Sequence, residues 1–186
     1  MLNHTICDVC HFSKQHKLPF SQSISYSTNC FDLIHCDILG PMPTHYVHGH
    51  MYFLTIVDDY SKHTWIFLMN AKSQTRELLQ NFIMKIKTQF NKTIKTVRSD
   101  NCPKFNFNAL YNDHGIEHQK SYVETRQQNS VVERKHQDTL NKTRSLIFQS
   151  NIPKAYWNYA SSHVVCLINR LPSVILKGKN PLWFTP

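Results

Sequence analysis

The chain has 186 residues, of which 41% are hydrophobic and 12% aromatic; it can bury a core, which excludes an intrinsically disordered protein. Lys and Arg number 21 against 12 Asp and Glu, a formal net charge of +9, so a polyanion such as nucleic acid is the expected partner. No run approaches about 18 consecutive apolar residues, and the N-terminus lacks the apolar stretch of a signal peptide, so we expect an intracellular protein without membrane association.

Cys7 and Cys10 have the C-x-x-C spacing of half a tetrahedral zinc site. Two thiolates on a tight turn hold Zn²⁺ only when two further ligands come from elsewhere. The nearby His4, His11 and His16 lack the spacing of the paired histidines of a zinc finger. Zinc binding and a pair of free, reduced thiols therefore both stay open.

The first predicted strand covers residues 31–38 and stops at the chain-breaking pair Gly40-Pro41. Asp37 is expected at the end of this strand, among apolar neighbours. An Asp in such surroundings loses hydration unless it is paired or bound to a cation. Asp37 is therefore a candidate metal ligand.

The second predicted strand, residues 51–57, is almost continuously apolar, which is typical of a central strand covered on both faces. A turn leads from it into a returning strand over 63–68, so the two strands predict a hairpin. Asp58 and Asp59 open the turn and are candidates for catalysis. Adjacent acids at such a place are more typical of a turn former.

A helix is predicted to begin near Ser73, whose side chain is expected to cap it. The apolar residues of this helix share one face: Leu79, Phe82, Ile83, Ile86 and Phe90. A strand over 93–99 follows and places Asp100 directly after its end. A short helix over 105–111 and a last short strand over 115–119 are predicted next.

The longest predicted helix covers residues 127–149. Its core stripe is Val132, Leu140, Thr143 and Ile147. Glu133 is expected at the margin of this stripe, beside the core, while Lys135 and Lys142 share a face that points toward a partner.

A last helix is predicted from Pro153, and residues 177–186 are expected to form an extended connection. The buried stripe of this helix is predicted to be Trp157, Ala160, Val164, Leu167, Ile168 and Leu171.

Asp37, Asp100 and Glu133 are three carboxylates from distant parts of the sequence. Such a set suits two divalent ions about 4 Å apart, one activating the attacking oxygen and one stabilising the leaving oxygen of a phosphodiester. Mg²⁺ suits the set because it prefers oxygen ligands and keeps waters that substrate phosphate can replace.

Several segments, in this order, resemble the integrase of copia-type retrotransposons. They are His35-Cys36-Asp37 with Gly40-Pro41, Thr55-Ile56-Val57-Asp58-Asp59-Tyr60-Ser61, Arg98-Ser99-Asp100-Asn101, Gln127-Gln128-Asn129-Ser130-Val131-Val132-Glu133-Arg134-Lys135-His136, and Asn169-Arg170-Leu171-Pro172. The resemblance runs over almost the whole chain. It implies an α/β, RNase H-like fold of the retroviral-integrase type, a mixed sheet flanked by helices. It also implies a D,D,E triad of Asp37, Asp100 and Glu133 that binds Mg²⁺ or Mn²⁺.

The family reaction is 3′-end processing followed by strand transfer, in which a DNA 3′-hydroxyl attacks a target phosphodiester. The resemblance implies DNA as the partner, both element ends and target, a homo-oligomer at full length, and action in the nucleus. Cys7 and Cys10 would be the cysteine half of the family's N-terminal HHCC zinc module, with the histidine half before Met1.

The domain organisation that follows has three parts. Residues 1–26 are a remnant of the zinc module and a linker, 27–150 the catalytic core, and 151–186 a C-terminal helix and the start of a connecting segment.

Four residues depart from the family pattern: Cys102 and Ser130 stand where Gly is usual, Lys104 where an acid is usual, and Arg126 where Pro is usual. These departures are typical of a truncated, decayed copy. A catalytically inactive nucleic-acid-binding remnant and an inert piece therefore remain alternatives to an active integrase. We expect Lys104 to weaken cation binding through like-charge repulsion, so that Lys104→Glu would raise Mg²⁺ affinity.

DNA-backbone contacts are expected from side chains around and after Glu133: Arg126, Asn129, Arg134, Lys135, Lys142 and Arg144. Contacts to phosphates give salt-dependent binding with little sequence preference. An ordinary solvated basic face is the alternative for each of these residues.

Overall fold

The computed structural model describes residues 27–42, 47–121 and 130–184. Its strands and α-helices, in chain order, are β1 (Leu33–Leu39), β2 (Tyr52–Asp58), β3 (Thr64–Met69), α2 (Thr75–Phe90), β4 (Thr96–Ser99), α3 (Asn108–Asp113), β5 (Glu117–Lys120), α4 (Ser130–Ser150) and α5 (Trp157–Arg170). Short 3-10 helices are η1 (Val47–Gly49), η2 (Lys72–Gln74), η3 (Pro103–Phe105), η5 (Lys154–Tyr156) and η6 (Pro181–Trp183). Within the described ranges, every helix is too short or too polar to cross a bilayer.

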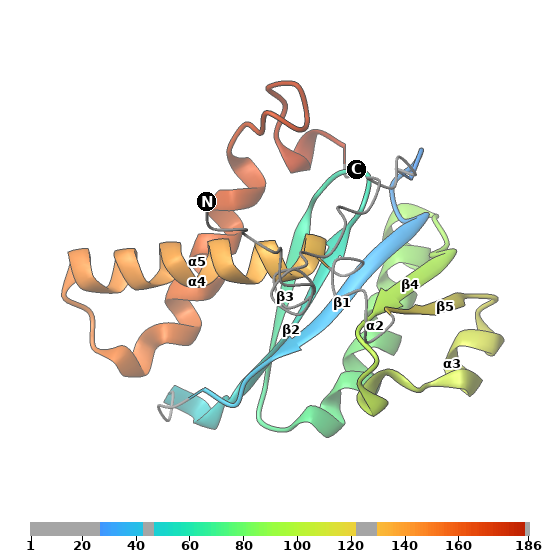
Figure 1. Cartoon of the computed structure of the whole chain (residues 1–186), viewed down its shortest axis with the longest axis horizontal. Helices are drawn as coiled ribbons and strands as arrows, with labels where there is room; N and C mark the ends of the chain where they lie inside the picture. The colour runs from blue at the N-terminus through green and yellow to red at the C-terminus, as the bar shows by residue number, and fades with distance from the viewer. Residues whose placement is uncertain (1–26, 43–46, 122–129, 185–186) are drawn as a thin grey trace, which may run out of the picture.

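The strands form one mixed sheet in the order β3-β2-β1-β4-β5 (Figure 1). β1, β2 and β3 are antiparallel neighbours, as the predicted hairpin requires, whereas β1, β4 and β5 run parallel. Six of the seven residues of β2 are buried, which confirms the prediction of a strand covered on both faces. The α/β class is therefore confirmed.

The two faces of the sheet carry different side chains because neighbouring residues of a strand point to opposite sides. Ile34 and Cys36 on β1 and Val97 on β4 belong to the main hydrophobic core, together with buried residues of α2 and α3. His35 and Asp37 alternate with them and point to the opposite face, where α4 packs on β1 and β2. We call this opposite side the α4 face.

The predicted core stripe of α2 is confirmed: Leu79, Phe82, Ile83 and Ile86 are buried and Phe90 is partly buried. The predicted cap is wrong, because Ser73 lies within η2 and α2 begins at Thr75. The start of α2 has no side-chain cap in the described part of the chain, and the side chain of Gln74 instead bonds the backbone at the start of η2. Its Oε1 accepts hydrogen bonds from the backbone N–H groups of Asn70 and Ala71 at 2.7 and 3.2 Å.

The predicted burial of Leu167 and Leu171 on α5 is wrong, since their side chains are 43% and 53% exposed. A polar residue, Asn169, faces inward instead. Its side chain accepts a hydrogen bond from the N–H of Thr64 at 2.9 Å and donates one to the carbonyl of Thr64 at 2.7 Å. β3 is an edge strand whose outer backbone groups need partners, so the backbone of β3 sets which face of α5 turns inward.

The predicted extended tail is also wrong. The N–H of Ser173 donates to the carbonyl of Lys179 at 3.0 Å, η6 follows, and Pro181 is buried. The carbonyl of Phe184 accepts a hydrogen bond from the Cys30 thiol at 3.0 Å, which ties the tail to the residues before β1.

Candidate active site

Asp37 and Asp100 lie side by side on neighbouring parallel strands. The pairing of β1 with β4 ends where Cys36 meets Ser99, so the next residue of each chain segment is one of the two acids. Asp100 follows the last residue of β4, as predicted. Asp37 is not at the end of its strand, because β1 continues to Leu39 through its pairing with β2.

Glu133 lies in the first turn of α4, on the face of the sheet to which the acid pair points. The pKa of Asp100 is raised by burial, then by the charge of Asp37 and, to a smaller degree, by the charge of Glu133. A hydrogen bond from the N–H of Cys102 at 3.2 Å opposes this rise. The three predicted acids therefore lie within electrostatic range of one another.

The side chains of these acids are not drawn together around a common point. In the part of the chain that the structure describes, no three His, Cys, Asp or Glu side chains are gathered closely enough to hold a metal ion. The prediction that Glu133 lies beside the core is wrong, because its side chain is exposed. The buried stripe of α4 runs instead through Val132, His136, Thr139, Thr143 and Ile147, and Leu140 is only partly buried.

His136 is a site residue to which the sequence analysis assigned no role. Its Nδ1 atom lies 3.3 Å from Oδ2 of Asp37, and its ring packs edge-on against Phe53 at 5.7 Å between centroids. The residue is 5% exposed, and its Nε2 atom has no hydrogen-bond partner among the described residues. The signal in the sequence was the i,i+3 spacing from Glu133, which places His136 one helical turn further along α4.

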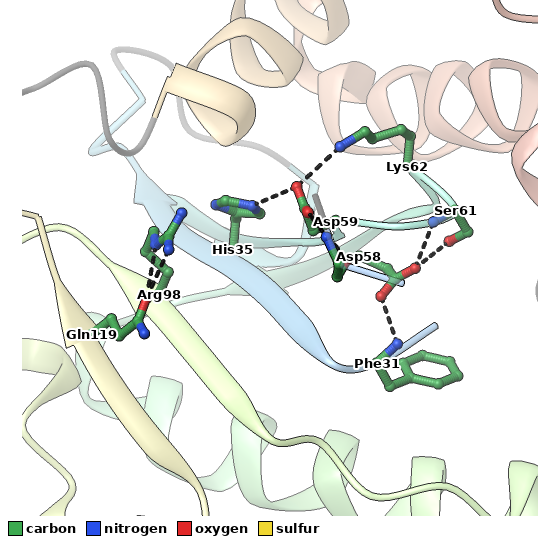
Figure 2. A network of polar contacts seen from close by, with 9 residues as sticks. Phe31, His35, Asp58, Asp59, Ser61, Lys62, Arg98 and Gln119 are labelled. Atoms are coloured by element: carbon green, nitrogen blue, oxygen red, sulfur yellow. Dashed lines mark hydrogen bonds and ion pairs between the residues drawn. The ribbon is translucent and has the colours of Figure 1, made fainter. Parts of the chain in front are cut away.

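Asp58 is buried in the turn after β2 (Figure 2). It accepts hydrogen bonds from the N–H of Phe31 at 2.7 Å and from the N–H and hydroxyl of Ser61 at 2.7 and 2.6 Å. These contacts close the hairpin turn and fasten it to the segment before β1. The interpretation of Asp58 as a turn former is confirmed.

Asp59 is 6% exposed and also serves the turn. Its Oδ1 atom lies 3.1 Å from Nε2 of His35 and 3.0 Å from Nζ of Lys62, as Figure 2 shows. Burial alone would raise the pKa of Asp59, but the bonds from His35, Ser27 and Lys62 outweigh burial and lower it well below its usual range. Asp59 is thus an ionised anchor that orients His35.

The cation that acts most strongly on Asp100 is Lys72, whose charge lowers the pKa of Asp100. Lys72 lies in η2, and its Nζ atom is 5.5 Å from the centre of the Tyr52 ring. Lys104 is exposed on η3. The sequence pattern points to Lys104 and not to Lys72, because only the fold brings η2 near the end of β4.

The predicted DNA contacts on α4 differ in exposure. Arg134, Lys142 and Arg144 are exposed, and Lys142 pairs with Asp138 one turn before it. Lys135 is partly buried, and burial lowers its pKa. The remaining predicted site residues lie outside the described part of the chain: Cys7, Cys10, Arg126 and Asn129.

The chain is similar to known proteins over most of its length. Residues 27–124 match the integrase core domain family. The chain is 34% identical over 178 residues to the retrovirus-related Pol polyprotein from transposon TNT 1-94 of Nicotiana tabacum, and 33% identical over 176 residues to that from transposon RE2 of Arabidopsis thaliana. Each match covers 94% of this chain, which spans only 13% and 12% of the lengths of these polyproteins.

Solved structures share the fold. A chain of the simian T-cell lymphotropic virus intasome in complex with PP2A regulatory subunit B56 gamma matches with a TM-score of 0.73 and 17% identity, over 92% of this chain and 59% of that one. The HTLV-2 integrase catalytic core domain in complex with magnesium matches with a TM-score of 0.63 and 15% identity, over 86% of this chain and 99% of that one.

The structural matches confirm the predicted RNase H-like fold of the retroviral-integrase type, with its mixed sheet flanked by helices. The plant transposon polyproteins confirm the resemblance to copia-type elements. The chain belongs to the integrase core domain family.

Proposed function

We propose that this chain is the catalytic core of a copia-type integrase that carries out 3′-end processing and strand transfer on DNA, with Asp37, Asp100 and Glu133 as its divalent-metal ligands. One observation carries the proposal. Burial and the like charges of Asp37 and Glu133 together raise the pKa of Asp100. A fold that sets three carboxylates against one another in this way stores a repulsion that a divalent cation relieves.

The donor set fits Mg²⁺ or Mn²⁺, since it consists of carboxylate oxygens, and the magnesium-bound HTLV-2 integrase core is a neighbour in fold. Bound ions of this kind supply an activated attacking oxygen and stabilise the leaving oxygen of a phosphodiester. Glu133 is exposed in the first turn of α4, so its side chain is free to rotate toward the acid pair. We propose that cation binding draws the Glu133 carboxylate toward Asp37 and Asp100.

The protein's own residues orient the reacting groups. His136 holds the carboxylate of Asp37 from α4, and the N–H of Cys102 holds that of Asp100. The exposed cations Arg134 and Arg144 on α4 are the proposed contacts to the DNA backbone, both of element ends and of target. Integrase cores of HTLV-2 occur in dimeric and trimeric forms, which supports a homo-oligomer for the full-length protein. Action on chromosomal DNA would require the protein to enter the nucleus.

A catalytically inactive DNA-binding remnant is the second candidate. It is favoured by the separation of the acid side chains, which are not gathered around a common point in the described residues. Such a remnant needs only the basic surface of α4. Zinc binding by Cys7 and Cys10 is a separate proposal, which the zinc content of the purified chain tests.

The test is metal-dependent phosphodiester transfer on a branched DNA substrate with Mn²⁺. A branch that is already joined is chosen because its reaction depends least on domains other than the catalytic core. The chain is compared with Asp100→Asn and with Glu77→Gln, which removes an exposed acid on α2. We expect product from the chain and from Glu77→Gln, and none from Asp100→Asn. No product from a folded, DNA-binding chain would contradict the integrase activity and favour the binding remnant.

A further inference from the structure

Arg98 occupies a defined place beside the acid pair. It lies on β4 two residues before Asp100, on the same face of the strand, and two residues of a strand advance about 6.6 Å. The register of β1 and β4 pairs Arg98 with His35, which is itself two residues before Asp37. Figure 2 shows Arg98 and His35 rising from neighbouring strands on the same side of the sheet. Arg98 and His35 therefore form a row beside the row of Asp37 and Asp100 on the α4 face.

A neutral side chain holds the guanidinium of Arg98. Its Nε and Nη2 atoms donate to Oε1 of Gln119 on β5 at 3.2 and 2.7 Å. The amide nitrogen of Gln119 in turn donates to Glu117 at 3.2 Å, which fixes the orientation of the amide. Arg98 is partly buried, and no carboxylate of the described residues forms an ion pair with it. The orientation of the guanidinium is therefore set by a neutral partner.

The neighbour of Arg98 on β1 supplies no negative charge. His35 is 1% exposed and is already bonded through Nε2 to Asp59. A partly buried guanidinium that is oriented by a neutral amide, and that forms no ion pair within the described residues, is suited to bind an anion from outside the chain.

We propose that Arg98 binds a DNA backbone phosphate next to the phosphodiester that reacts at the acids, with Gln119 as the residue that positions the guanidinium. This role rests on the proposed function. One DNA strand carries a phosphate about every 3.4 Å along the helix axis, so a site about 6.6 Å from the acids meets a nearby phosphate of the same strand. Two guanidinium N–H groups match two phosphate oxygens, and Lys does not reproduce that geometry.

The test is DNA binding in EDTA, followed by fluorescence anisotropy of a labelled duplex between 50 and 200 mM NaCl, an interval over which phosphate contacts change affinity steeply. The full chain is compared with Arg98→Gln and with the charge-matched control Lys120→Gln, because Lys120 is exposed and adjoins Gln119 on β5. Loss of one phosphate contact lowers the slope of log K against log salt by about 0.9. We expect that change for Arg98→Gln, with several-fold weaker binding, and a smaller change for the control. Equal slopes for the two variants would overturn the role of Arg98.

If Arg98→Gln does not fold, Gln119→Glu tests whether Arg98 binds a DNA phosphate. The new carboxylate would pair with Arg98 and compete with phosphate, at the same net charge as Lys120→Gln. We expect weaker DNA binding than in that control, and binding equal to the control would contradict the inference. The assay contains no divalent metal, so a chain that fails in strand transfer but binds DNA through Arg98 contradicts only the proposed catalysis.

Discussion

The Nδ1 atom of His136 lies 3.3 Å from the Oδ2 atom of Asp37, so a buried ring on α4 holds a carboxylate on the sheet. His136→Ala should release that carboxylate and weaken Mn²⁺ binding by about tenfold, the low end of what loss of a group behind a metal ligand costs. His136→Asn keeps a hydrogen-bond donor and should restore part of the affinity. Mn²⁺ titration measures both, and Mn²⁺ affinities equal to that of the unaltered chain would contradict a positioning role.

Lys72 and Lys104 are two candidates for the positive charge that opposes binding of a metal ion by the three acids. Lys72 acts on the pKa of Asp100, whereas Lys104 is exposed on η3. Removing a charge roughly 10 Å from a divalent ion in water changes affinity about fourfold. Lys72→Gln should therefore strengthen Mg²⁺ binding by up to about fourfold, and Lys104→Gln should do so less. A larger gain for Lys104→Gln than for Lys72→Gln would show that Lys104 is the closer charge.

Asp59 should contribute stability in a pH-dependent way. Its folded-state pKa lies below its unfolded value, so the contribution is present above about pH 4, near the ordinary Asp pKa, and is lost as the pH falls further. Asp59→Asn leaves His35 and Lys62 without their charged partner and should lower the free energy of unfolding at pH 7 by about 2 to 4 kcal/mol.

The control for this variant is Asp138→Asn, which breaks an exposed ion pair with Lys142 and should cost less than about 1 kcal/mol. Urea unfolding at pH 7 and at pH 3 measures both. A deficit for Asp59→Asn that is equally large at pH 3 would assign the effect to packing rather than to charge.

The sequence predicted the strands and the helix types because periodicity reports which face is buried. The alternation in residues 93–99 and the apolar run 51–57 became β4 and β2 with shifts of a few residues at their ends. The preference of single residues for capping positions predicted the helix starts less well. Ser73 is a good capping residue, but the side chain of Gln74 bonds the backbone ahead of α2 instead.

Hydrophobic periodicity could not predict the contacts that form only when the sheet is assembled. Asn169 faces inward because the edge strand β3 offers unpaired backbone groups at Thr64, and this turns Leu167 toward solvent. For the site, the sequence named the three acids. It could not give His136 behind Asp37 or Lys72 beside Asp100, since both arise from segments that meet only in three dimensions.

Direct binding of Mn²⁺, followed by electron paramagnetic resonance of the free ion, tests the three carboxylates as one site. The chain is compared with Asp37→Asn, Asp100→Asn, Glu133→Gln and the surface control Asp138→Asn. We predict that the chain and the control bind Mn²⁺ alike, and that each of the other three variants loses about tenfold or more in affinity. Binding that is unchanged in those three variants, or absent from the folded chain, would contradict the assignment of Asp37, Asp100 and Glu133 as metal ligands.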